Sequence, residues 1–245
     1  MPKKFKIIII TIIILSFVVG GIWYWNKNIN QAKKEKEKTA FITGFTLLDD
    51  EKNLDWDRTS AKFSQEARAQ FEKKVSDIKN NLAKAEDKGT RLANYNDLAI
   101  YQHYLGNYKE SYDAYIESLK LEDRNRVTWQ NFADVLLAVK AYKSAEAAYK
   151  KAVDLNKYIP ESYVKLANYY QVLGDDIKVE QTYQSAIETI RQSLENDALV
   201  LDSYADWLVS KQRHDEAIKI LRELQAEQPD NKEAIEREIE KLNKL

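Results

Sequence analysis

Apolar residues follow two patterns along the chain. From Ile7 to Trp25 they form one run that contains no charged residue. From residue 60 onward they recur at intervals of three and four, which is the spacing of one face of an α-helix. The chain has only six glycines and three prolines, the residues that most often interrupt helices. The patterns therefore predict an all-α protein, with one membrane-spanning helix followed by a series of amphipathic helices.

The apolar run is long enough to cross a bilayer. Its 19 residues would extend over roughly 28 Å as a helix, close to a hydrocarbon core of about 30 Å. It ends in Trp23, Tyr24 and Trp25, and aromatic rings favour the membrane interface. A cleaved signal peptide is the alternative, but the run is longer than a usual signal core and lacks a small-residue cleavage site. We therefore expect a basic tail over residues 1–6 and an uncleaved transmembrane helix over residues 7–25.

The basic residues at the two ends of this run bear on its orientation. Three lysines precede it, and five lysines follow within residues 26–38. Counting alone favours a cytoplasmic C-terminal side. The preceding lysines, however, adjoin the apolar run directly, as in an uncleaved signal sequence, and this favours the opposite orientation. We expect a single-pass membrane protein whose repeat domain is extracytoplasmic.

Residues 26–59 are predicted to form a juxtamembrane linker. Lysines lie at its start, and acidic residues cluster between Asp49 and Asp57. A calcium-binding loop is one interpretation of this cluster. Leu54, however, stands where such a loop needs glycine, and Ser60 stands where it needs glutamate. The cluster is therefore interpreted as a solvated loop.

The first amphipathic helix is expected within residues 60–91. Apolar residues from Phe63 to Ala85 recur at helical spacing. The sequence Asp87-Lys88-Gly89 is interpreted as the stop of this helix, because glycine suits the left-handed cap. The apolar face needs a partner, so we expect this segment to be a packing helix against the first helix pair.

The remainder of the chain repeats itself. Turn sequences at Gly106, Lys140 and Gly174 follow one another after 34 residues, and a fourth at Gln212 follows after 38. Large-small pairs recur in the same register at Leu98-Ala99, Phe132-Ala133, Leu166-Ala167 and Tyr204-Ala205. Small residues and then bulky ones follow the turns, at Ser111, Ala145, Val179 and Ala217, and at Tyr115, Tyr149, Tyr183 and Leu221. We predict four stacked helix pairs at residues 92–125, 126–159, 160–197 and 198–231, the third with a longer second helix.

In these positions the chain resembles the tetratricopeptide-repeat (TPR) family. That family places a bulky residue, a large-small pair, a turn, a small residue and an aromatic at these spacings. This sequence departs from the pattern, because alanine replaces glycine in the large-small pair and only the last unit has a closing proline, Pro229. The resemblance implies a TPR-like α-solenoid of antiparallel helix pairs. Residues 232–245 are expected to form the polar-backed capping helix that such an array needs.

The resemblance also implies a binding surface, because in this family the first helix of each unit lines a concave groove that binds a protein or peptide. Carried over by register, the groove residues are Asn96, Ile100, His103, Tyr104, Val127, Gln130, Asp134, Leu137, Glu161, Val164, Asn168, Gln171, Leu199, Asp202, Asp206 and Val209. The carboxylates among them favour a basic or neutral ligand.

A subtype of the family captures C-terminal carboxylates with a basic clamp. Asn131 fits that subtype, but Glu161 stands where a lysine is needed and Ile100 where an asparagine is needed. A receptor for anionic C-termini is therefore disfavoured.

Charge and composition exclude several other functions. The charge is +6 up to Lys38, zero from Thr39 to Arg91 and −7 from Leu92 onward, so the distal part does not suit nucleic acid. The absence of cysteine excludes disulfides and thiolate sites. There is no glycine-rich phosphate loop, and His103 and His214 are isolated. We expect no catalytic residue, no metal and no cofactor.

The preferred hypothesis is a membrane-anchored scaffold or adaptor that binds a protein or peptide during envelope protein assembly or quality control. A structural protein that forms homo-oligomers through its repeats and anchor is an alternative. A receptor-like import component with cytoplasmic repeats is another. An enzyme is the least favoured, because no convergent set of polar residues is evident.

Overall fold

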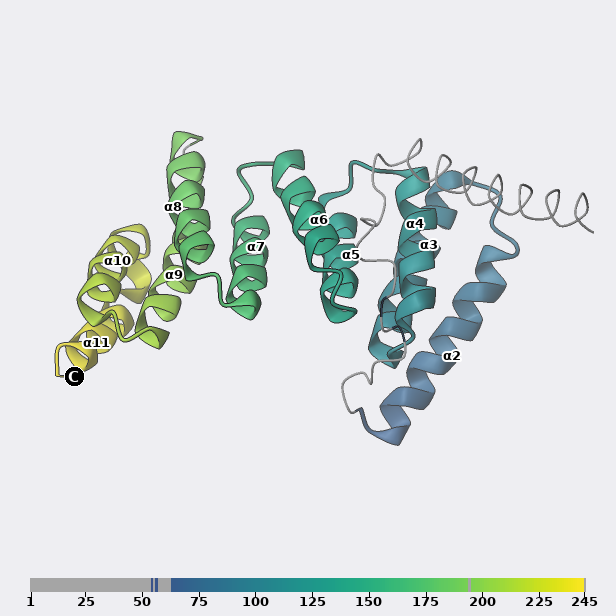
Figure 1. Ribbon diagram of the computed structural model, residues 1–245, viewed down its shortest axis with the longest axis horizontal. Helices are drawn as coiled ribbons and strands as arrows, with labels where there is room; N and C mark the ends of the chain where they lie inside the picture. The colour runs from purple at the N-terminus through teal and green to yellow at the C-terminus, as the bar shows by residue number, and fades with distance from the viewer. Residues whose placement is uncertain (1–53, 55, 57–62, 194, 245) are drawn as a thin grey trace, which may run out of the picture. The chain divides into compact units, whose positions relative to one another are not determined.

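The computed structural model describes residues 54, 56, 63–193 and 195–244 (Figure 1). These residues belong to one compact unit, Leu47–Leu245, and its described part is built from helices without a strand. No helix in this part is long and apolar enough to cross a membrane. The predicted basic tail 1–6, the predicted transmembrane helix 7–25 and nearly all of the predicted linker 26–59 lie outside the described residues.

The helices follow one another as antiparallel pairs (Figure 1). They are α2 (Gln65–Leu82), α3 (Lys88–Leu105), α4 (Tyr108–Leu121), α5 (Arg126–Ala138), α6 (Tyr142–Leu155), α7 (Pro160–Leu173), α8 (Asp176–Gln192), α9 (Ala198–Ser210), α10 (His214–Glu227), the 3₁₀ helix η2 (Pro229–Asn231) and α11 (Lys232–Leu242). Each helix packs on the next along the chain. The predicted all-α helical repeat is confirmed.

The start of α3 corrects one expectation. Asp87 does not help to end the preceding helix: it is the N-cap of α3, and its side chain accepts a hydrogen bond of 2.8 Å from the Thr90 amide. Gly89 lies in the first turn of α3. Residues 88–91 therefore belong to α3 and not to the packing helix, which ends at Leu82. Aspartate is a strong N-cap residue, and here that preference outweighs the stop signal of glycine.

The four turns within the pairs share one backbone conformation. Gly106, Lys140, Gly174 and Gln212 have positive φ angles of 80°, 65°, 70° and 59°. The residue after each of them donates its amide to a carbonyl five residues back, as in Asn107 to Gln102 at 2.9 Å. This is the 6→1 bond of a Schellman motif, which reverses the chain after a helix. The two turns without glycine thus adopt the geometry of the two turns that have it.

The small residues of the large-small pairs are buried in the array. Ala99, Ala133, Ala167 and Ala205 are at most 1 % exposed. The hydroxyl of the buried Ser111 donates to the Ala99 carbonyl at 2.7 Å and so joins α4 to α3. Small buried side chains allow helices to pack closely, and large aromatic side chains such as Trp129, Tyr115 and Tyr149 are buried in the same core.

The four pairs are α3 with α4, α5 with α6, α7 with α8 and α9 with α10. The third pair has a longer second helix, as the sequence predicts. α8 has 17 residues, whereas α4, α6 and α10 have 14 each. Arg191, in the added turn, lies 2.6 Å from the buried carboxylate of Asp197 and 2.9 Å from Glu223 of α10. The added turn therefore ties the third pair to the fourth.

Candidate functional site

The residues predicted to bind a partner lie on the first helices of the four pairs. α3 contacts α5, α5 contacts α7, and α7 contacts α9. An ion pair of 2.8 Å between Lys165 Nζ and Asp134 Oδ2 joins α7 to α5. We call the surface formed by the predicted positions on α3, α5, α7 and α9 the first-helix face.

The N-terminal end of the first-helix face is aromatic. Tyr104 is 45 % exposed. Its ring centroid lies 5.5 Å from that of Phe71 and 6.1 Å from that of Phe63, which lies just before α2. Ile100 is half-buried on the same helix. The packing helix α2 therefore borders this end of the face.

Asn96 is used for packing between helices. Its side-chain amide donates to the Leu92 carbonyl at 3.1 Å. Its Oδ1 accepts hydrogen bonds of 3.0 Å from the hydroxyls of Ser118 on α4 and Thr128 on α5. Both hydroxyls are buried, at 0 and 2 % exposure. Asn96 thus holds three helices together, and these bonds occupy the groups that a ligand would need.

His103 contributes no positive charge to the face at neutral pH. Burial lowers the pKa of its imidazole; Asp134 acts in the opposite direction, and Lys165 lowers the pKa further. Its ring lies 5.5 Å from that of Tyr108. A histidine with a lowered pKa is neutral at pH 7, so His103 offers the face a polar but uncharged group.

In the middle of the face, Gln130 is buried, although the sequence predicts that it lines the groove. This side chain is only 5 % exposed, and it donates to the Ser162 hydroxyl at 3.3 Å. Gln130 is therefore a contact between two units and is not presented to a partner. Val127 is 48 % exposed, whereas Leu137 is half-buried.

Asp134 is exposed in part but is neutralised within the protein. Its two oxygens accept hydrogen bonds from the Tyr149 hydroxyl and from Lys165. Burial raises the pKa of Tyr149, and the negative charge of Asp134 raises it further. Asp134 therefore holds the array together, and its charge is largely compensated.

On α7 the face is polar. Glu161, Asn168 and Gln171 are exposed, and Val164 is half-buried. The Gln171 amide donates to Asn168 at 3.3 Å and to the Tyr183 hydroxyl at 3.2 Å.

The C-terminal end of the face is acidic. Asp202 and Asp206 are exposed on α9, with Leu199 41 % exposed and Val209 half-buried beside them. Burial raises the pKa of Asp202, and the charge of Asp206 raises it further. Among the ion pairs of the described residues, none includes Asp202 or Asp206.

Glu238 of α11 belongs to the same group. Burial raises its pKa, the charges of Asp206 and Asp202 raise it further, and Lys241 acts in the opposite direction. We call Asp202, Asp206 and Glu238 the acidic end. Asp206 thus raises the pKa of Asp202, and both raise the pKa of Glu238, so this end of the face favours a cation beside it. No group of three or more metal-ligating side chains suited to a metal ion is found in the part of the chain that the structure describes.

Two of the charged contributors were not predicted from the sequence. Lys165 lies 31 residues after Asp134, and no local signal connects them. Glu238 lies in the capping helix, where its charge looks like part of a solvated face. An alignment of helices in space is needed to bring either residue to this surface.

Comparison with known proteins supports the fold. No family model and no curated protein matches the sequence. Among solved structures, that of MamA aligns with a TM-score of 0.50 and 16 % identity, over 71 % of this chain and 98 % of that chain. TTC0263, described as a thermophilic TPR protein of Thermus thermophilus, aligns with a TM-score of 0.48 and 15 % identity, over 74 % of this chain and 94 % of that chain. Yeast Tom70 aligns with a TM-score of 0.43 and 17 % identity, over 84 % of this chain and 54 % of that chain. At these identities the likeness concerns the fold alone: the chain is an all-α helical repeat that resembles the TPR solenoids.

Proposed function

We propose that this chain is a protein-binding scaffold that presents its first-helix face to a segment of a partner protein. The observation that carries the proposal is the acidic end, where Asp202 and Asp206 are exposed on α9 and none of the ion pairs among the described residues includes either of them. An exposed face with apolar side chains at Val127 and Leu199 and a concentrated charge has the features of a peptide-binding surface.

The charge distribution indicates a ligand that is basic at one end and neutral elsewhere. Asp134 is compensated by Lys165, so the middle of the face carries little net charge. The negative charge is concentrated on α9 and α11. Two opposite charges about 4 Å apart near a protein surface attract by about 4 kcal/mol before desolvation is subtracted. A lysine or arginine of the partner is therefore expected beside α9, with apolar or amide-bearing residues along α5 and α7.

The proposal includes the membrane anchor predicted over residues 7–25, with the repeats on the extracytoplasmic side. Anchoring confines the binding face to the membrane surface and raises the effective concentration of partners that are also bound there. The uncharged run of 19 residues and the adjoining lysines support this assignment. Envelope protein assembly or quality control is the process that this arrangement suits.

Binding can be tested with the full chain in detergent micelles. The probe is a fluorescent peptide of about 12 residues with two arginines near one end, and its control has citrulline at both positions. Asp202→Lys/Asp206→Lys should weaken binding of the arginine peptide by about tenfold or more. Asp215→Lys/Asp230→Lys changes the net charge equally at exposed sites away from the face and should alter binding less than about twofold. Equal weakening by both variants, or equal binding of both peptides, would contradict the proposed ligand chemistry.

Topology is tested by protease accessibility in intact cells and in inverted membrane vesicles. Digestion from outside the cell supports the extracytoplasmic adaptor. Digestion only from the cytoplasmic side refutes that orientation and favours a receptor-like import component. Cross-linking in membranes then separates the adaptor from a self-associating structural protein, because the latter gives homomers as the main product.

A further inference from the structure

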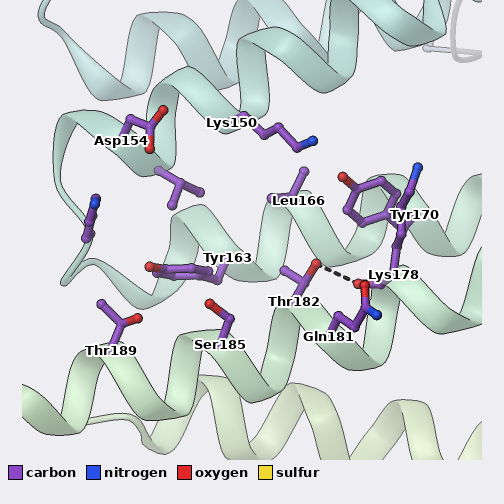
Figure 2. Close-up of a pocket in the computed structure, with 12 residues that line it drawn as sticks. Lys150, Asp154, Tyr163, Leu166, Tyr170, Lys178, Gln181, Thr182, Ser185 and Thr189 are labelled. Atoms are coloured by element: carbon purple, nitrogen blue, oxygen red, sulfur yellow. Dashed lines mark hydrogen bonds between the residues drawn. The ribbon is translucent and has the colours of Figure 1, made fainter.

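A second surface of the array is hollowed between the second and third helix pairs. The cavity has a volume of about 460 Å³ and is bounded by α6, α7 and α8 (Figure 2). Tyr163, Leu166 and Tyr170 of α7 form its floor, and each is at most 7 % exposed. Lys150 stands on the α6 wall, and Lys178 stands on the α8 wall near Tyr170 (Figure 2). We call this cavity the middle groove.

The middle groove lies on the far side of α7 from the first-helix face. Successive residues of an α-helix are rotated by about 100°. On that basis the floor residues 163, 166 and 170 are centred about 150° from the predicted binding positions 161, 164, 168 and 171. A ligand in the middle groove therefore does not compete for the first-helix face.

The preceding junction, between the first and second pairs, provides an internal comparison. The residues 34 positions before the floor residues are Trp129, Phe132 and Leu136, and each side chain is at most 1 % exposed. The residue that corresponds to Lys150 is Ile116, which is 7 % exposed. Ile116 and this apolar floor are buried at the first junction, so the repeat architecture itself does not require the polar lining of the middle groove.

The α8 wall departs from the repeat in the same way. Thr182 and Thr189 stand where the preceding unit has Ala148 and Leu155. The Thr182 hydroxyl donates to the Lys178 carbonyl at 2.6 Å (Figure 2). Burial raises the pKa of Tyr163 on the floor, while a hydrogen bond with Thr189 lowers it. Polar side chains thus replace apolar ones at several positions of one junction and give the groove a polar lining.

The charged groups of the middle groove are mainly lysines. Three lysines and one carboxylate, Asp154, line it, whereas the chain from residue 92 onward carries a charge of −7. Lys150 and Lys178 lie 2.8 and 3.8 Å from the same oxygen of Glu146. Among the ion pairs of the described residues, none includes Lys157.

The existing ion pairs at this groove are weak enough to exchange. The side chains of Lys150 and Lys178 are 56 % and 46 % exposed. Lys178 also lies 3.4 Å from Asp175 and 5.0 Å from the ring of Tyr170. Ion pairs with this exposure contribute about 0–1 kcal/mol each. The two ammonium groups can therefore turn from Glu146 and Asp175 toward carboxylates that enter the groove.

We propose that the middle groove binds an acidic segment of a partner polypeptide, whose carboxylates pair with Lys150, Lys157 and Lys178 above the tyrosine floor. The α8 wall runs from residue 178 to residue 189, which is roughly 16 Å of helix. An extended segment of about five residues covers that length. The Ser185 hydroxyl and the Gln181 amide can bond the backbone of such a segment.

The test uses the full chain in detergent and a fluorescent peptide of about 12 residues that contains four glutamates. A peptide with glutamine at the same positions is the chemical control. Binding is measured by fluorescence anisotropy at about 0.15 M salt, where distant surface charges are largely screened. The acidic peptide should bind at least about tenfold more tightly than the glutamine peptide.

Two groove variants and one matched control locate the site. Lys150→Glu/Lys178→Glu reverses charge on both walls and should weaken binding by about tenfold or more. Lys151→Glu/Lys219→Glu makes the same change in net charge at exposed positions outside the groove and should weaken it less than about twofold.

The second groove variant closes the cavity with residues of the preceding unit. Lys150→Ile/Thr182→Ala/Thr189→Leu should abolish binding of the acidic peptide while the helical content stays unchanged. Equal weakening by the charge reversal and its control, undiminished binding by the closed variant, or no preference for glutamate over glutamine would each overturn the proposal. The first-helix face is untouched by these variants, so binding of a basic peptide reports on it separately.

Discussion

The free-energy cost of a left-handed backbone conformation can be measured at the turns within the helix pairs in two ways, by removing it at one turn and by introducing it at another. Lys140 and Gln212 have φ angles of 65° and 59°, in turns equivalent to those of Gly106 and Gly174. A left-handed conformation costs a residue with a Cβ atom about 1–2 kcal/mol, whereas glycine adopts it freely. Replacing Lys140 by glycine should remove this strain, and replacing Gly174 by alanine should introduce it.

The magnitude follows from two opposing terms. Glycine also gives the unfolded chain more conformational freedom, which lowers stability by about 0.4–1 kcal/mol. The net expectation for Lys140→Gly is therefore a stabilisation of about 0.5–1 kcal/mol. For Gly174→Ala a destabilisation of the same size is expected. An alanine Cβ at Gly174 would meet no atom within 4 Å, so no clash contributes to that value.

The assay is urea unfolding of the full chain in detergent, followed by circular dichroism. The free energy of unfolding is taken from the midpoint and slope of the transition. Lys140→Ala is the control, because it removes the lysine side chain and keeps the strained conformation, and it should leave stability nearly unchanged. A Lys140→Gly chain that is less stable than the parent, or a Gly174→Ala chain that is equally stable, would refute the reasoning.

Three further predictions concern packing and charge. Asn96→Ala should lower the free energy of unfolding by about 2 kcal/mol, because two buried hydroxyls lose their acceptor. Asn94→Ala, which removes a bond within one helix, should cost less than about 0.5 kcal/mol, and equal losses would contradict the assigned role. Asp197→Ala should cost about 1–3 kcal/mol in the same assay, because it leaves Arg191 without its buried partner; an unchanged midpoint would refute this. The pKa values of the Asp202 and Glu238 carboxyls are raised in the folded protein. Their protonated forms therefore stabilise the fold at low pH, and this contribution to the free energy of unfolding is lost as pH rises through the raised pKa values. A basic peptide should correspondingly lose affinity as pH falls through the same values, above the ordinary 3.8 and 4.5, and Asp202→Asn should flatten this pH profile.

The repeat register could be predicted because several positions of each unit recur with the same spacing. Glycine marks the turns at residues 106 and 174, and the 34-residue period locates the turn at Lys140 between them. The turn at Gln212 follows after 38 residues and is located by its spacing from the large-small pair Tyr204-Ala205. Helix starts are less certain, as Asp87 shows, because one short sequence can carry both a stop signal and a cap signal. Where two local signals overlap, the packing of the following helix decides between them.

The binding face could be predicted only in outline. Helical register places Gln130 on the correct helix and turn, but its burial is due to Ser162 in the next unit. Asn96 is likewise engaged by hydroxyls 22 and 32 residues away. The width of an exposed stripe depends on how neighbouring units are rotated, and a single-helix pattern does not contain that rotation.

The middle groove illustrates how a repeat protein gains a second surface without a change of fold. Stability in such arrays is the sum of each unit and its contacts with adjacent units. Replacing Ile116 and Ala148 of one junction by Lys150 and Thr182 of the next removes apolar contacts at a single interface and leaves the other interfaces intact. The loss is therefore local, whereas the gain is an open groove on the side of α7 opposite the first-helix face. Because α7 contributes residues to both surfaces on opposite sides, the array can bind one ligand on the first-helix face and an acidic segment in the middle groove at once.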